Sequence, residues 1–212
     1  MFWSAAKLPL SEEQQQWIEA SLQWLIKQFG VEYFLNRRLI LPQPAFFPDK
    51  FNGTEECVLK LVERICSYMD VDSGVIVVEM FSDRDDTALK HRLGGESQHS
   101  GAAGTFSKAK GEKMKVAINI SQLKNPTGLV ATIAHELGHV ILLGGGRISH
   151  SDENHELLTD LLTVFLGMGI FTANAAFQFS QWQDHSHQGW RASRLGYMSE
   201  ECLVIRWQQL RG

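Results

Sequence analysis

The stretch "TIAHELGHVILLGGG", Thr132–Gly146, decides how the rest of the chain is interpreted. It places two histidines and an acid in a run of otherwise apolar residues, which predicts a buried helix. Residues four apart lie about 40° apart around a helix axis, so His135 and His139 would project from one face as a pair of metal ligands. Glu136 would lie one step round the helix, where it can act as a base without being a ligand. The stretch therefore predicts a metal site suited to hydrolysis.

Apolar periodicity and cap residues predict the remaining elements. The predicted helices run from Ser11 to Gly30, from about Thr54 to Met69, from Asn125 to the glycines 144–146, from Ser151 or Asp152 to about Gly169, from Ala173 to Trp182 and from Ser199 to Leu210. The predicted strands are 74–81, 101–106 and 114–120. A polar, glycine-rich loop, Ser82–Gly101, separates the first two strands, and the sequence leaves open whether it is a lid.

This order of elements predicts one α+β domain over residues 1–212. A small mixed sheet from about Val75, Ala102 and Val116 would pack on the motif helix, with other helices around it. Within the domain we expect an N-terminal helical part (1–72), the sheet with the metal-site helices (73–170) and a C-terminal helical part (171–212).

Composition limits the function classes. A chain that is 44% hydrophobic and 21% charged is typical of a globular protein, and a net charge of −4 argues against a nucleic-acid partner. The three cysteines lack C-x-x-C spacing, which favours a reducing, cytoplasmic compartment. The amino terminus does not resemble a signal peptide, and the longest apolar run, Leu157–Phe171, is interrupted by polar residues. We therefore expect no membrane span.

A third ligand is needed, because a catalytic zinc ion takes three protein ligands and keeps one open position. The predicted apolar helix that follows the glycines carries one polar stripe, formed by Glu156, Thr159, Asp160 and Thr163 at spacings of three and four. A carboxylate buried there without a partner would cost several kcal/mol. Glu156 is the candidate ligand, and Asp160 could accept the free ring N–H of a zinc-bound histidine.

These two segments together resemble a known group. "HELGH" at 135–139 followed by "ELLTD" at 156–160 is similar to the gluzincins, the thermolysin-like branch of the zincin metallopeptidases, whose pattern is HExxH followed by ExxxD. The resemblance covers roughly Leu129–Phe171. More loosely, "HELLTDLLTVFLGMGIFTAN" at 155–174 resembles bacterial zincin-like proteins of unassigned function.

The resemblance implies roles for five residues. His135, His139 and Glu156 would bind Zn²⁺, Glu136 would be the general base, and Asp160 would orient a ligand histidine. The implied activity is hydrolysis of peptide bonds in a peptide or protein substrate. Two departures point to a minimal version, because the connection between the two motifs is short for a thermolysin-like enzyme and 212 residues is a small chain for that group.

Candidates outside the two motifs are less specific. The family resemblance implies that Tyr197 could stabilise an oxyanion, although an aromatic residue just before a helix also packs as a staple. His185 and His187 could form a second metal site or lie on the surface. The small residues 102–104 could let an extended peptide bind along an edge strand, or simply form a short strand.

A different class of function stays open. The domain could bind zinc without catalysis, as a protein-interaction or metal-sensing module. A closed site would favour that alternative, and His150, Asp152 or His155 could supply the fourth ligand. Glu156 and Asp160 could also be only an acid pair at a helix N-terminus. An intact Glu136 favours the enzyme, because a structural zinc site has no use for a base.

Overall fold

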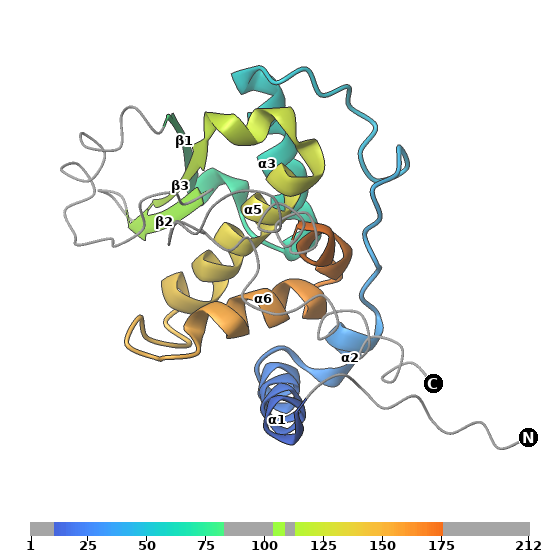
Figure 1. Cartoon of the computed structure of the whole chain (residues 1–212), viewed down its shortest axis with the longest axis vertical. Coiled ribbons are helices and arrows are strands. Elements are labelled where there is room, and N and C mark those ends of the chain that lie inside the picture. The colour runs from blue at the N-terminus through green and yellow to red at the C-terminus, as the bar shows by residue number, and fades with distance from the viewer. Residues whose placement is uncertain (1–10, 83–103, 109–112, 176–212) are drawn as a thin grey trace, which may run out of the picture.

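The computed structural model describes residues 11–82, 104–108 and 113–175 (Figure 1). The helices are α1 (Glu12–Phe29), α2 (Val31–Leu35), α3 (Glu55–Met69), α5 (Pro126–His139) and α6 (His155–Phe165), with short helical turns η1 (Ser73–Val75), η3 (Ile120–Lys124) and the π-helical η4 (Val140–Gly144). The strands are β1 (Ile76–Phe81), β2 (Gly104–Lys108) and β3 (Met114–Asn119). A further helical segment covers 169–175.

The three strands form a mixed sheet in the order β1-β3-β2. β1 runs parallel to β3, with Ile76 opposite Met114, and β2 runs antiparallel to β3, with Gly104 opposite Ile118. The predicted small mixed sheet is confirmed, but three of its strand limits were wrong. β3 ends at Asn119, one residue earlier than predicted, because Ile120 begins the turn η3. β1 begins two residues later than predicted because the Asp72 side chain caps the turn η1, and β2 continues past 106 to Lys108.

α5 is the central helix of the molecule. It contacts β2 and β3 on one side and packs against α3 and α6, while α1 covers α6 from outside (Figure 1). Most of its residues are buried, as the sequence predicted. The segment Pro126–Gly144 is long and apolar enough to cross a membrane, but 78% of it is buried inside the protein, which is also how the core helix of a soluble protein behaves.

Local capping explains why three of the helices begin where the sequence predicted. Ser11 accepts a hydrogen bond from the backbone of Gln14, whose side chain in turn accepts from the Ser11 backbone, forming a capping box. Thr54 and Asn125 cap α3 and α5 without the reciprocal bond, since each side chain accepts a hydrogen bond from the backbone N–H three residues later, and Pro126 occupies the first turn of α5. The short helix α2 was not predicted.

The predicted limits of α6 were wrong. The Asp152 carboxylate accepts a hydrogen bond from the Ser149 backbone at 2.8 Å and does not cap the helix, which begins only at His155. α6 ends at Phe165 because Gly167 adopts a positive φ of 86° and its carbonyl accepts a backbone hydrogen bond from a segment preceding α3. The next helical segment begins at 169, before the predicted Ala173.

Several predictions fall outside the described residues. These are the loop from 83 to 101, the small residues 102 and 103, the last part of the helix predicted to end at Trp182, and the helix predicted from Ser199 to Leu210.

Candidate metal centre

Two helices bring three potential metal ligands together. α5 contributes His135 and His139, which lie one turn apart, and α6 contributes Glu156. Glu156 Oε2 lies 3.0 Å from His135 Nε2 and 3.3 Å from His139 Nε2. One potential ligand atom from each residue lies within 4.8 Å of the other two. The three residues therefore form a triad that could hold a metal ion, as the sequence predicted.

The helices can approach so closely because α5 has no side chain at the crossing point. Gly138, inside the His-Glu-Leu-Gly-His sequence, lies against Thr159 of α6. A Cβ atom at Gly138 would lie 2.7 Å from Thr159 Cγ2, well inside van der Waals contact. The glycine thus contributes to the site through helix packing, since it allows the ligands of α5 and α6 to meet.

Asp160 lies where the sequence predicted an orienting partner. Its carboxylate is 2.8 Å from His135 Nδ1, and the residue is 0% exposed. An ionised carboxylate only accepts hydrogen bonds, so His135 Nδ1–H donates and Nε2 is turned toward Glu156. This is the arrangement in which a carboxylate fixes the ring of a metal-binding histidine.

His139 has a different neighbour, whose role the sequence did not reveal. Its Nδ1 lies 3.3 Å from the hydroxyl of Thr159, which is also fully buried. Thr159 was noted only as a member of the polar stripe, although its place one turn after Glu156 on that stripe was a signal for contact with a ligand.

The charges of the triad are strongly coupled. Burial opposes the charged form of His135, but its hydrogen bonds to Asp160 and Glu156 raise its pKa well above the usual value. Burial also opposes the ionised form of Glu156, yet its two histidine neighbours lower its pKa. Burial is the main reason why the pKa of His139 is lowered. The triad therefore combines an ionised carboxylate, Glu156, with one histidine whose charged form is stabilised, His135, and one whose charged form is destabilised by burial, His139.

Glu136 is buried beside the triad and is not part of it. It is 5% exposed, and its Oε2 atom has no hydrogen-bond partner among the described residues. Burial raises the pKa of this carboxyl group to about 7. A buried carboxylate oxygen without a partner is unfavourable unless a cation, a water molecule or a ligand group completes its surroundings. This orphaned oxygen and the nitrogen and oxygen donors of the triad fit a metal site with a base beside it.

The alternative fourth ligands lie at different distances from the triad. His155 Nε2 is 3.2 Å from Glu156 Oε1, the oxygen that faces away from the two other histidines, while its Nδ1–H donates to the Asp152 carbonyl at 2.8 Å. His155 is thus adjacent to the triad without belonging to it. The His150 ring lies beyond His155, with 6.2 Å between their centroids.

Tyr197, His185 and His187 lie outside the described residues, so their predicted roles remain predictions.

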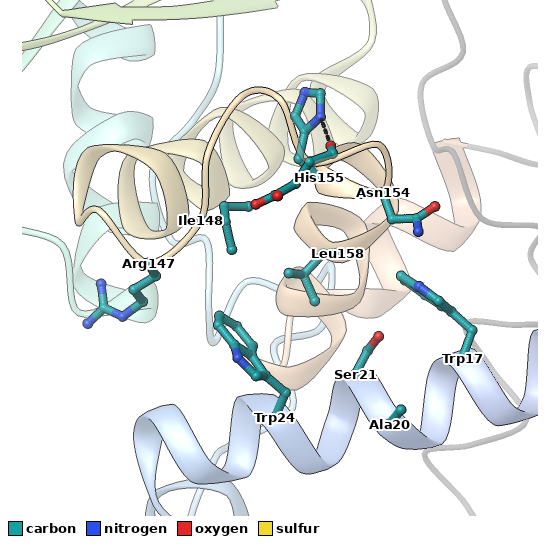
Figure 2. A pocket seen from close by; sticks show the side chains of 10 residues that line it. Trp17, Ala20, Ser21, Trp24, Arg147, Ile148, Asn154, His155 and Leu158 are labelled. Carbon is teal, nitrogen blue, oxygen red and sulfur yellow. Dashed lines mark hydrogen bonds between the residues drawn. The ribbon is translucent and has the colours of Figure 1, made fainter.

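A groove of about 480 Å³ lies between α1 and the connection that leads into α6 (Figure 2). Trp17 and Trp24 of α1 face Leu158 of α6 across it. The imidazole of His155 points away from the two tryptophans. Glu156 and Leu158 are two residues apart and therefore project from nearly opposite faces of α6. The helix therefore lies between Leu158 and Glu156, whereas His155, at the start of α6, both lines the groove and contacts the Glu156 carboxylate.

The chain was compared with protein-family models, curated proteins and solved structures, and nothing matched it in any of the three comparisons.

Proposed function

We propose that this protein is a zinc-dependent metallopeptidase with a minimal zincin-like fold of the gluzincin type, acting on a peptide or protein substrate. One observation carries the proposal. Two imidazole Nε2 atoms converge on one carboxylate oxygen of Glu156, and a second buried carboxylate, Glu136, lies next to them with one oxygen that has no hydrogen-bond partner in the part of the chain that the structure describes. A site that only held metal would need His135, His139 and Glu156. The buried carboxylate of Glu136 would then lower the stability of the protein without contributing to metal binding.

The donor set supports zinc over the other common divalent ions. Two neutral imidazoles and one carboxylate suit Zn²⁺, whereas Mg²⁺ and Ca²⁺ prefer oxygen ligands throughout. Three protein ligands also leave one coordination position for water or substrate, which a hydrolytic site requires. His135, His139 and Glu156 would hold the ion, and Asp160 would keep the His135 ring in the orientation that it has in the structure.

The roles of the chain's own residues follow from their placement. Bound zinc supplies Lewis acidity, which makes water more acidic and a carbonyl group more electrophilic. Glu136 accepts the proton of the attacking water and delivers it to the leaving amine. Tyr197 is the proposed donor to the oxyanion.

A non-catalytic zinc-binding module is the second candidate, and His155 is the observation that favours it. Its Nε2 atom lies 3.2 Å from the Glu156 carboxylate, close to the triad. A small shift of this side chain in the loaded protein would provide a fourth ligand and close the site. Such a protein would bind zinc through four residues and would not cut peptides.

Glu136→Gln separates the two candidates, because the amide has nearly the same size but cannot accept the proton. The wild-type protein and the variant are loaded with zinc and incubated with a broad peptide library, with Glu63→Gln, an exposed position on α3, as the matched control. We expect hydrolysis to fall at least about a hundredfold in Glu136→Gln, with unchanged zinc content. Activity that survives Glu136→Gln would reject the assigned base, and a wild-type protein that holds zinc but cuts nothing would favour the binding module.

A further inference from the structure

Thr159 makes two polar contacts from a fully buried position on α6. Its hydroxyl oxygen lies 2.7 Å from the backbone carbonyl of His155, one turn earlier in the helix. The same oxygen lies 3.3 Å from Nδ1 of His139 on α5. This hydroxyl therefore connects the backbone of one metal-site helix to a potential ligand on the other.

The direction of the two hydrogen bonds follows from the atoms involved. A carbonyl oxygen carries no proton, so the single hydroxyl proton of Thr159 is donated to His155. The hydroxyl oxygen can then only accept a hydrogen bond from His139, which requires a proton on the Nδ1 atom of that ring. A neutral imidazole carries one ring proton. With that proton on Nδ1, the Nε2 lone pair of His139 is free for a metal ion. In the metal-free protein the Glu156 carboxylate oxygen, 3.3 Å from Nε2, competes with the Thr159 hydroxyl for the same ring proton.

We infer that Thr159 is a positioning residue that holds His139 in the Nδ1–H tautomer and thereby makes Nε2 available to the metal. The inference rests on the proposed function in one respect, since metal binding is what the free Nε2 atom would serve. The two histidines of the triad are then fixed by different means. A carboxylate, Asp160, holds His135, and a neutral hydroxyl group holds His139.

The methyl group of Thr159 contributes to helix packing and not to the hydrogen bond with His139, so the two groups can be removed separately. Its Cγ2 atom lies against Gly138, at the point where the two helices cross. Thr159→Val keeps a methyl group at that place and removes only the hydroxyl, whereas Thr159→Ser keeps the hydroxyl and removes the methyl group. Thr163→Val is the matched control, because the Thr163 hydroxyl is equally buried one turn later and bonds to the Asp160 carbonyl and to Thr172.

The test has two readouts. The first is the tautomer of His139 in the metal-free protein, from the pattern of couplings between ring nitrogens and ring protons in ¹⁵N NMR spectra. The second is zinc affinity, from titration against a competing chelator. Against the competing Glu156 carboxylate, we expect a larger Nδ1–H population in the wild type, in Thr159→Ser and in Thr163→Val than in Thr159→Val. In Thr159→Val we expect a substantial Nε2–H population and zinc affinity reduced about 10- to 100-fold, which is the usual effect of losing such a partner.

Two results would overturn the inference. One is a wild-type protein whose His139 carries its proton on Nε2, which needs no variant to observe. The other is Thr159→Val with the wild-type tautomer and wild-type zinc affinity. A wild-type protein that binds no zinc would instead reject the proposed function, and the tautomer measurement would still decide the inference about Thr159. If Thr159→Val does not fold, the wild-type tautomer decides the question.

Discussion

At the scale of single residues, two carboxylates that lie one turn apart on α6, those of Glu156 and Asp160, make different contacts with the histidines of α5. Glu156 faces both histidines of α5 with one oxygen atom, whereas Asp160 reaches only the far ring nitrogen of His135. The first position suits a metal ligand and the second suits a residue that orients a ligand. These contacts fit the separate roles that the sequence predicted for the two acids of the polar stripe.

This distinction predicts unequal effects on zinc binding. Glu156→Gln should abolish tight binding because it removes a ligand charge, whereas Asp160→Asn should weaken binding roughly 10- to 100-fold because it removes only an orienting partner. Glu153→Gln, an exposed position just before α6, is the control and should behave as the wild type. Competition with a chelator measures all three affinities. Equal losses in Glu156→Gln and Asp160→Asn would mean that the ligand assignment is wrong.

Glu136 predicts a pH dependence of stability in the metal-free protein. Burial raises its pKa in the folded state to about 7, from an ordinary value of 4.5. Between these values the unfolded chain has lost the proton and the folded protein retains it, so the free energy of unfolding falls as pH rises. Relative to Glu136→Gln, the wild type should lose roughly 3 kcal/mol between about pH 4.5 and pH 7. Urea unfolding of both proteins across that range measures the difference, and parallel pH profiles would contradict the account.

At the scale of secondary structure, sequence and structure agree where a local interaction decides the outcome. Ser11, Thr54 and Asn125 were predictable helix starts because each cap involves residues only three positions apart. The start of α6 was not predictable in this way, since Asp152 is used within its own loop. Its end depends on Gly167 meeting a segment far away in the sequence, which no local pattern reveals.

The crossing of α5 and α6 carries a prediction about Gly138. Gly138→Ala should destabilise the protein by about 1–3 kcal/mol and weaken zinc binding, because the added methyl group collides with Thr159 Cγ2 and separates the ligand-bearing helices. Thr159→Ser removes the atom that is hit. The double variant should therefore be more stable than the sum of the two single effects predicts, as measured in a double-mutant cycle. Strict additivity would mean that this contact does not set the helix spacing.

At the scale of the whole molecule, the sequence predicted the residues of the metal site more accurately than it predicted the fold around them. The spacing within 135–139 and 156–160 predicted which side chains share a face of each helix, and the resemblance to the gluzincin pattern implied that the two faces meet. The strand order β1-β3-β2 and the cover that α1 provides over α6 depend on long-range packing. The partner of His139 was missed although Thr159 lies on the same polar stripe as Glu156, because a hydroxyl group at that position is not part of the HExxH and ExxxD pattern.

The central claim is that two helices of this fold form an open zinc site beside a buried base. The most direct test is metal analysis of the purified, zinc-loaded protein together with X-ray absorption at the zinc edge, which reports the number and type of ligand atoms. The account predicts about one zinc ion per chain, with two imidazole nitrogens and with oxygen ligands that include a water molecule. Protein that retains no zinc after loading, or a zinc ion with a third imidazole in a closed site of four protein ligands, would contradict it.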